Sequence, residues 1–175
     1  MSDDDITEAE TADDVQWLTP EQQHDWRALV EMLALLPATL DAQLKRDAGL
    51  NGYEFQVLAG LAEAPGRTLG LSDLADMAQG SLSRLSHAIT RLERSGLVER
   101  RACTERAGRR AEARLTENGV AKLEDVAPGH VREARRLVVD VLTAEQLAAL
   151  GEAARAINEV TRAGAPEVCT ELGDC

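Results

Sequence analysis

Hydroxyl, imidazole and guanidinium side chains gather in one short segment of the chain, residues 81–94. A guanidinium can bind two acceptors of one planar group at once, such as O6 and N7 of guanine, and a serine hydroxyl can bond to several bases. The segment therefore offers the chemistry of base-edge recognition, and a solvated polar surface is the alternative for an isolated helix. The candidate residues are Ser81, Ser83, Arg84, His87 and Arg91.

The apolar residues between these polar ones predict a helix with one buried face. They recur at i, i+3, i+4 and i+7, the spacing that places side chains on one side of a helix. Ser81 is expected to cap the first turn, and Gly96 is expected to end the helix in a left-handed conformation. The polar candidates then project from the opposite face. The apolar residues are Leu85, Ala88, Ile89 and Leu92.

The elements around this helix follow the order of a winged helix-turn-helix. A shorter helical pattern precedes it across a tight turn at Gln79-Gly80. Two strands are predicted after it, at Leu97–Arg101 and Arg110–Thr116, with Cys103–Arg109 turning between them. In such a domain the second helix enters the DNA major groove, and the hairpin loop reaches the flanking backbone or minor groove.

The predicted hairpin carries arginines that would contact phosphates. Arg106, Arg109 and Arg110 lie in or beside the loop, where guanidinium groups can neutralise phosphates and enter a narrow minor groove. Alone, such a run is most simply explained as solubilising charge. Beside a recognition helix it favours double-stranded DNA as the partner. The alternative class is a winged helix that docks proteins without binding DNA, which the acidic bulk of the chain would suit.

Charge is distributed unevenly along the 175 residues, whose formal net charge is −12. Residues 80–115 hold nine arginines and four glutamates, a net charge of +5, whereas residues 1–25 hold nine acids and no lysine or arginine. Screening confines each field to roughly 10 Å at 0.1 M salt. A basic reading element can therefore attract DNA although the chain as a whole is acidic.

Helical patterns flank this module on both sides. A capping box at Thr19–Gln22 opens a first helix that Pro37 should kink or split, and a second helix is expected at Asn51–Glu63. Thr116 is expected to cap a further helix, which Pro128-Gly129 should interrupt or bend. A second capping box, beginning at Thr143, opens the last helix. The expected fold is thus mainly α with a small β-hairpin wing.

The flanking helices hold more leucine, valine and alanine than a small winged domain needs. We therefore expect them to pair with a second copy, which would present two recognition helices about 34–36 Å apart on an inverted-repeat operator. The alternative is a monomer whose terminal helices finish its own core. The expected organisation is a disordered acidic tail at 1–18, a dimerisation helix at 19–48, a winged helix-turn-helix DNA-binding domain at 49–116, C-terminal dimerisation helices at 117–162 and a flexible tail at 163–175.

Short motifs follow one another along the chain in a specific order. They are Trp26-Arg27, Ala64-Pro65-Gly66, Leu74-Ala75, Ser83-Arg84-Leu85-Ser86-His87, Arg91-Leu92-Glu93, Gly96-Leu97-Val98, Arg100, Leu115-Thr116, Gly119 and Ala127-Pro128-Gly129-His130-Val131. In these motifs, over about Thr19 to Val160, the chain resembles MarR-family transcriptional regulators of the actinobacterial kind. The resemblance implies a triangular homodimer that binds a palindromic operator, most commonly as a repressor. It also implies release when a small, frequently aromatic or phenolic, ligand enters a cleft.

The predicted wing departs from the family pattern. Family wings commonly carry an acidic residue before the second strand, paired with an arginine. Here Arg106 or Ala107 occupies that position, and the loop is slightly longer. The wing is therefore expected to be more cationic and less braced from within, with Glu105 as a substitute for the missing acid.

The few aromatic residues give a second candidate site. Arg27 follows Trp26 on the first helix, and Tyr53 and Phe55 open the second. A cation beside aromatic rings could hold an aromatic carboxylate by charge-assisted bonds and stacking. Taken one by one, these residues are more simply explained as core aromatics and an arginine paired with a nearby acid.

Other classes of function find little support in the sequence. It has no glycine-rich phosphate loop, nucleophile elbow or cluster of histidines and carboxylates, so neither an enzyme nor a cofactor is expected. The histidines lack metal-ligand spacing, so no metal is expected either. No apolar run could cross a bilayer, and three cysteines without a secretory segment fit a reducing cytoplasm. Cys103 is expected to be an inert thiol, with redox modulation of the wing as the alternative.

Overall fold

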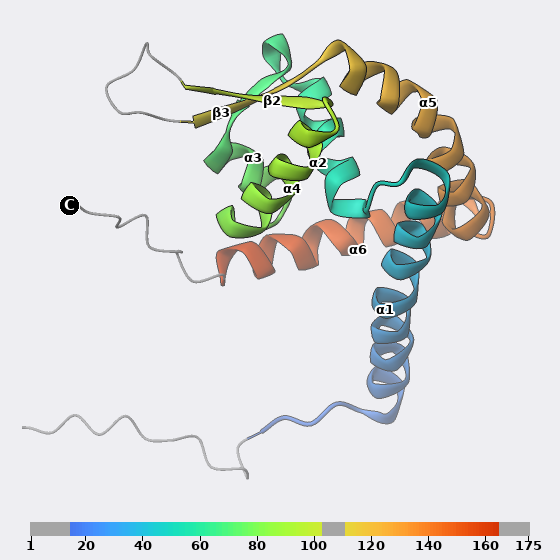
Figure 1. The fold of residues 1–175 in the computed structure, drawn as a ribbon. Helices are drawn as coiled ribbons and strands as arrows, with labels where there is room; N and C mark the ends of the chain where they lie inside the picture. The colour runs from blue at the N-terminus through green and yellow to red at the C-terminus, as the bar shows by residue number, and fades with distance from the viewer. Residues whose placement is uncertain (1–14, 103–110, 165–175) are drawn as a thin grey trace, which may run out of the picture. The chain divides into compact units, whose positions relative to one another are not determined.

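Helices and a small antiparallel sheet make up the described part of the chain (Figure 1). The computed structural model describes residues 15–102 and 111–164, so the acidic segment at 1–14, the wing tip at 103–110 and the tail from 165 lie outside it. Two compact units divide between Thr39 and Leu40, within the first helix. The elements are α1 (Pro20–Ala48), α2 (Gly52–Glu63), a 3-10 turn (Pro65–Arg67), β1 (Thr68–Gly70), α3 (Leu71–Met77), α4 (Leu82–Arg94), β2 (Val98–Ala102), β3 (Ala111–Leu115), α5 (Glu117–Ala134), a π-helical turn (Arg135–Val139) and α6 (Ala144–Ala163).

Helix α1 begins at the predicted capping box and continues through Pro37. The Thr19 hydroxyl accepts from the Gln22 backbone N–H at 3.2 Å, and the Gln22 side chain accepts from the Thr19 N–H at 2.9 Å. Pro37 lies inside a helix that runs from Pro20 to Ala48, so of the two predicted effects, a kink or a split, the split does not occur. The reason is that a proline removes one backbone donor, whereas its φ is compatible with a helix and the turns on both sides keep their bonds.

Helix α5 shows the same tolerance of proline. Thr116 caps it as predicted, accepting from the Gly119 N–H at 3.0 Å. Pro128 and Gly129 lie inside an α-helix that continues to Ala134, so the predicted interruption does not occur. The regular helix gives way later, at the π-helical turn Arg135–Val139. The capping box at Thr143 then opens α6, as the sequence predicted.

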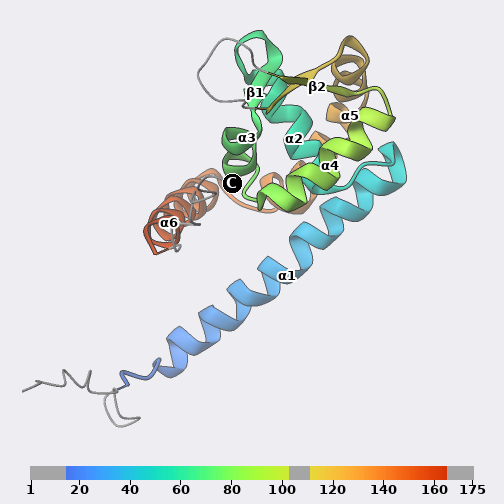
Figure 2. The ribbon, with the colours of Figure 1, turned by 60° about the vertical axis from the view of Figure 1, so that its left-hand side comes forward.

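The hydrophobic core lies among α2, α3, α4 and the sheet, which Figure 2 shows gathered together. The apolar face predicted for α4 is confirmed, because its members are 0–5% exposed. Burying a leucine or isoleucine side chain contributes roughly 1.5–3 kcal/mol, so these contacts hold α4 against its neighbours. The largest fully buried side chains of this core include Leu58, Leu61, Leu74, Leu85, Ile89, Leu92 and Leu115.

The sheet has the strand order β1-β3-β2, with both pairs antiparallel. Strands β2 and β3 confirm the predicted hairpin to within two residues at each end, and Val98 pairs with Leu115 in the register. Strand β1 was not predicted, because three residues are too short to show an alternating pattern. The fold is therefore the expected winged helix-turn-helix, with one further strand at the edge of the wing.

The turn between α3 and α4 depends on close packing. Gln79 adopts a left-handed conformation with φ 52°. At Gly80, a Cβ atom would lie only 2.4 Å from the Tyr53 hydroxyl oxygen, so a side chain there would displace the tyrosine. The predicted tight turn is thus made by a left-handed glutamine followed by a glycine that leaves room for Tyr53. Within residues 15–102 and 111–164, none of the helices has the length and apolar character to cross a membrane.

Candidate nucleic-acid interface

Helix α4 presents a polar face opposite its buried one, and this face carries the predicted recognition residues. Ser81 is the N-cap, and its hydroxyl accepts from the Arg84 backbone N–H at 3.2 Å. Ser83, Arg84, His87 and Arg91 are all exposed. The structure therefore brings together the five predicted residues of this segment at one surface.

One flank of this face contacts the start of α2. The Arg84 guanidinium lies over the Tyr53 ring, 4.2 Å from its centroid. The ring is 7% exposed, and this burial raises the pKa of the Tyr53 hydroxyl, although the nearby Arg84 charge acts in the opposite direction. A cation over an aromatic face is attracted by the ring quadrupole. One face of the Arg84 guanidinium is thus held by the Tyr53 ring, while the side chain remains exposed to solvent.

Arg91 on the same flank forms an ion pair with Glu54 of α2. The Arg91 Nε and Nη2 atoms lie 2.7 and 2.5 Å from Glu54 Oε1. The other carboxylate oxygen, Oε2, accepts from the Asn51 N–H at 2.9 Å and completes a capping box with the Asn51 side chain. Sequence reasoning missed Glu54, although the spacing of Asn51 and Glu54 is a recognisable capping-box pattern.

The opposite flank of the α4 face contacts strand β2 through Arg100. The Arg100 Nη2 atom donates to the Ser86 carbonyl at 2.9 Å and to the Thr90 hydroxyl at 3.0 Å. Its Nε atom lies 3.2 Å from Glu93 Oε2, and its backbone N–H donates to Glu93 Oε1 at 3.0 Å. Arg100 is therefore engaged within the protein, and the hydroxyl of Thr90 is engaged with it.

The centre of the face lies between these two flanks. At 100° per residue, Ser83, His87 and Arg94 lie within about 40° of one another around the helix axis. All three are exposed, and none of their side chains makes a hydrogen bond or ion pair with another described residue. Together with the Arg84 guanidinium, which contacts only the face of the Tyr53 ring, these groups have donors and acceptors to offer to a groove.

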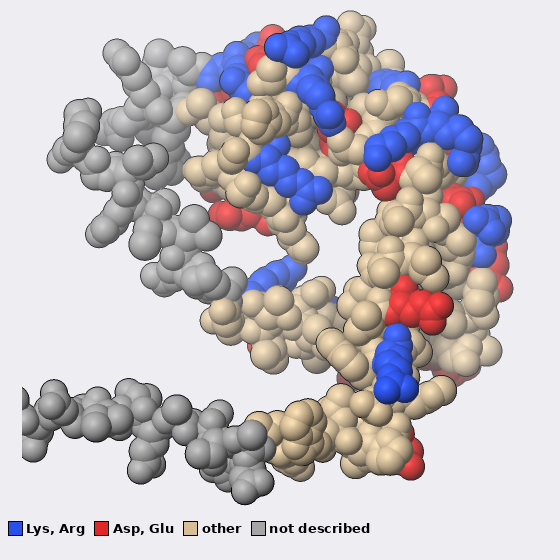
Figure 3. All heavy atoms as spheres, turned by 60° about the horizontal axis from the view of Figure 1, so that its bottom comes forward, with Lys and Arg blue, Asp and Glu red and all other residues tan. Residues whose placement is uncertain are grey.

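The base of the wing is closely balanced in charge. Glu99 of β2 lies 2.5 Å from Arg101 and 3.5 Å from Arg114, the latter on β3. Figure 3 shows the wider pattern on one face of the molecule, where acidic side chains lie directly beside several basic ones. The predicted phosphate-contacting residues Arg106, Arg109 and Arg110 lie outside the described residues, as do Glu105 and the three cysteines.

The predicted ligand-binding residues are divided between the two compact units. Trp26 and Arg27 are exposed on the part of α1 that belongs to the first compact unit. Tyr53 and Phe55 belong to the second unit and contact different elements, because Tyr53 packs under Arg84 and the Phe55 ring lies 4.6 Å from that of His130 on α5. Tyr53 is a core residue, as the simpler explanation held, and the cation over its ring is Arg84.

A cavity of about 370 Å³ lies beside the Arg84 flank of α4. It is bordered by the last turns of α1, the start of α2 and the outer side of α4. Its lining is rich in cations, although Lys45 is paired with Asp41 at 2.6 Å. Among the described residues, no group of three or more histidine, cysteine, aspartate or glutamate side chains could hold a metal ion. The cavity-lining residues are Asp41, Lys45, Asn51, Tyr53, Arg84, His87, Ala88 and Arg91.

A helix-turn-helix followed by a β-hairpin, with a polar outer face on its second helix, defines a winged helix-turn-helix protein. No protein-family model and no curated protein matches the chain, but solved structures do. Sco3205, a MarR family transcriptional regulator from Streptomyces coelicolor solved in complex with DNA, is 44% identical, with a TM-score of 0.80 over 83% of this chain and 91% of that one. AbsC, another MarR family transcriptional regulator from Streptomyces coelicolor, is 38% identical, with a TM-score of 0.79 over 85% and 99% of the two chains.

The chain belongs to the MarR family of transcriptional regulators, as the sequence motifs predicted. The relatives at this level of identity are transcriptional regulators and not enzymes. A more distant structure, NadR in complex with 4-hydroxyphenylacetate, is 23% identical, with a TM-score of 0.60 over 82% of this chain and 97% of that one. At that identity the likeness concerns the fold alone.

Proposed function

We propose that this chain is a sequence-specific DNA-binding regulator, in which α4 reads the major groove and the wing contacts the flanking DNA. The observation that carries the proposal is the outer face of α4, where Ser83, His87 and Arg94 are exposed between two anchored flanks. Imidazole, hydroxyl and guanidinium groups are suited to base edges. The complex of the relative Sco3205 with DNA supports the same partner for this chain.

The working form is a homodimer on an inverted repeat. Apolar side chains on the terminal helices are more than half exposed, among them Leu33 on α1 and Ile157 and Val160 on α6. A second copy would cover these surfaces and contribute the second recognition helix, which a palindromic operator requires. We propose dimerisation through residues 19–48 and 117–162, with the winged domain between them. Repression is the expected outcome, because a bound dimer obstructs a promoter.

The proposal is tested by sequencing the genomic fragments that the purified full-length protein retains, and then by measuring affinity for the recovered site at several salt concentrations. We expect an inverted repeat with half-sites one helical turn apart and an affinity that falls steeply with salt. The proposal would be wrong if the protein retained no duplex better than a scrambled sequence. The competing function is docking of a protein by the winged domain. It predicts no affinity for duplex DNA, and binding of the protein partner that is insensitive to salt when the arginines of α4 and the wing are neutralised.

We further propose that a small aromatic acid releases the regulator by binding in the cavity beside α4. The cavity is lined by Tyr53 and Arg84, whereas Lys45 and Arg91 beside them are paired with Asp41 and Glu54. A carboxylate that binds Arg84 there would compete with DNA for this cation. The test is release of the bound duplex by 4-hydroxyphenylacetate, with cyclohexylacetate as a control of equal charge that lacks the aromatic ring. Equal release by both compounds, or by neither, would contradict this part of the proposal.

Two smaller assignments follow from the proposed function. We assign no catalytic step to this chain, because its relatives regulate transcription and α4 offers groups for recognition. We also place it in the cytoplasm, where its operator DNA would be accessible. Visualising a fluorescent fusion with the bacterial nucleoid would check the second assignment.

A further inference from the structure

The contacts of Arg100 differ from those of an arginine that faces DNA. Its guanidinium bonds to the Ser86 carbonyl, the Thr90 hydroxyl and the Glu93 carboxylate, and the Ser86 hydroxyl lies within 3.4 Å. All of these acceptors belong to α4, whereas Arg100 belongs to β2. A single side chain thus joins the strand that leads into the wing to the side of the recognition helix.

The contacts of Arg100 with Ser86, Thr90 and Glu93 form a joint between β2 and α4. Ser86 and Thr90 are one turn apart on α4, and the Thr90 hydroxyl itself donates to the Ser86 carbonyl at 2.8 Å. Glu93 accepts from the backbone N–H of Arg100 as well as from its side chain. The main chain of β2 is therefore held at the same point as the guanidinium, which fixes the direction in which the strand leaves the helix.

We infer that Arg100 is a positioning residue, which sets the angle of the wing on α4 so that both can engage one duplex. The inference rests on the proposed function, because it concerns how two DNA-contacting elements are held together. It assigns Arg100 and the hydroxyl of Thr90 to a contact between β2 and α4, although Arg100 is exposed and both residue types would suit DNA contacts. The planar guanidinium is needed because it reaches several acceptors in a fixed geometry, which an ammonium group cannot do.

The test compares R100K with R101K in the full-length protein. Both variants keep the charge, and Arg101 is the next residue of the same strand, but its guanidinium pairs with Glu99 of that strand and not with α4. We expect R100K to bind the operator about tenfold more weakly and R101K to bind nearly as the unaltered protein does. Hydroxyl-radical footprints of R100K should lose the flanking minor-groove protection and keep the central one.

A variant from the partner side separates positioning from charge. T90V removes an acceptor of Arg100 without changing shape or charge, so it should weaken operator binding in the same way. The double variant R100K/T90V should be little weaker than R100K alone, because both changes break one joint. R100K that binds and footprints like R101K would overturn the inference, as would fully additive effects of the two changes.

A measurement without DNA distinguishes failure of the joint from failure of the proposed function. In the free protein, hydrogen exchange of the β2 backbone amides should be faster in R100K than in R101K, since the strand has lost its attachment to α4. Equal exchange in both variants would refute the joint even if the protein binds its operator. Faster exchange in R100K would uphold the joint even if no duplex is retained, in which case only the proposed DNA-binding function fails.

Discussion

The guanidinium of Arg91 is paired with a carboxylate, that of Glu54, whose side chain is 6% exposed, whereas the arginine side chain is 59% exposed. The pair joins the recognition helix α4 to the first turn of α2. The two partners are unequal in burial, so the loss of one is not equivalent to the loss of the other. This inequality gives the pair a distinctive response to mutation.

Arg91→Ala should destabilise the fold more than Glu54→Gln. The arginine variant leaves a buried carboxylate with no cationic partner, which we expect to cost roughly 2–4 kcal/mol. The glutamine variant keeps an acceptor for the Asn51 N–H and leaves Arg91 free to be hydrated, so its cost should be smaller. Urea unfolding at fixed protein concentration measures both. The double variant should be more stable than Arg91→Ala alone, and a double variant that is less stable would contradict this account.

His87→Ala should relax base preference, whereas Arg109→Ala should weaken binding to all sequences. His87 is at the centre of the exposed α4 face, so we expect its loss to cost roughly 1–3 kcal/mol at one operator position. Arg109 is expected from the sequence to contact phosphate, so its loss should flatten the salt dependence of binding by about one unit. Affinities for a set of single-base operator variants, each measured at several salt concentrations, separate the two effects. If His87→Ala lost affinity equally for all the operator variants, this prediction would be contradicted.

Gly80→Ala should disturb the helix-turn-helix through Tyr53. The added methyl group would meet the Tyr53 hydroxyl at 2.4 Å and its ring carbons at 2.7 Å, so the ring under Arg84 must shift. Overpacking of this kind typically costs about 1–3 kcal/mol. Gly129→Ala is the matched control, because its methyl group would come no closer than 3.5 Å to its neighbours. Thermal unfolding should show a lower Tm for the first variant only, and operator affinity should fall with it.

His130 should make the fold less stable in mildly acidic solution. Burial lowers the pKa of His130 below its ordinary value of 6.5, so the unfolded chain binds the proton first as the pH falls. The contribution of neutral His130 to the free energy of unfolding is therefore fully present above pH 6.5. It decreases below this pH, by at most about 1.4 kcal/mol per pH unit. The lowered pKa values of Asp41, Asp47 and Glu133 act in a more acidic range.

The variant His130→Phe isolates this contribution. Phenylalanine keeps an aromatic ring against Phe55 and does not titrate. Unfolding free energies at about pH 7.5 and pH 5.5, compared between the two proteins, should therefore differ less in the variant. The same pH dependence in both proteins would show that His130 is not its source.

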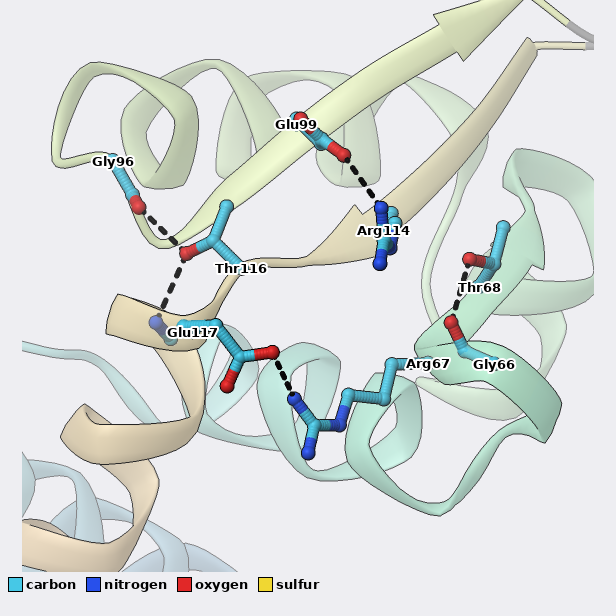
Figure 4. Close-up of polar contacts among 9 residues, drawn as sticks. Gly66, Arg67, Thr68, Gly96, Glu99, Arg114, Thr116 and Glu117 are labelled. Carbon is cyan, nitrogen blue, oxygen red and sulfur yellow. Dashed lines mark hydrogen bonds and ion pairs between the residues drawn. The ribbon is translucent and has the colours of Figure 1, made fainter.

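Thr116→Ala should loosen the connection between α4 and α5. The Thr116 hydroxyl donates to the Gly96 carbonyl at 2.7 Å and accepts from the Gly119 N–H, as Figure 4 shows together with the nearby Arg67–Glu117 pair. Loss of both bonds should cost roughly 1–2 kcal/mol. Thr143→Ala removes the cap of α6, which lacks such a second bond among the described contacts, and should cost less. Equal losses in the two variants would contradict the bridging role.

Sequence reasoning predicted those features of the candidate site that depend on the spacing of residues within one helix. The buried face of α4, the cap at Ser81 and the exposed positions of Ser83, Arg84 and His87 were all predicted correctly. The partners of the flanking arginines were not, because Glu54 and Arg91 are 37 positions apart and no periodicity links them. The same limit applies to Arg100, whose bonds to α4 depend on how β2 leaves the helix.

The sequence by itself determined the helices, their caps, the order of a winged helix-turn-helix and the family, because caps and apolar periodicity act within a few residues. The tertiary structure alone decided that α1 and α5 continue through their prolines, that β1 joins the wing and that Arg84 lies over Tyr53. The last two outcomes depend on packing between segments distant in the chain, where the free energy of burial and pairing outweighs local preference. Pro37 and Pro128 are exposed, and their helices continue because the turns on both sides keep their bonds. Residue types therefore indicated the binding chemistry, and only the fold separated the groups that bond to no other described residue from those that hold α4 against α2 and β2.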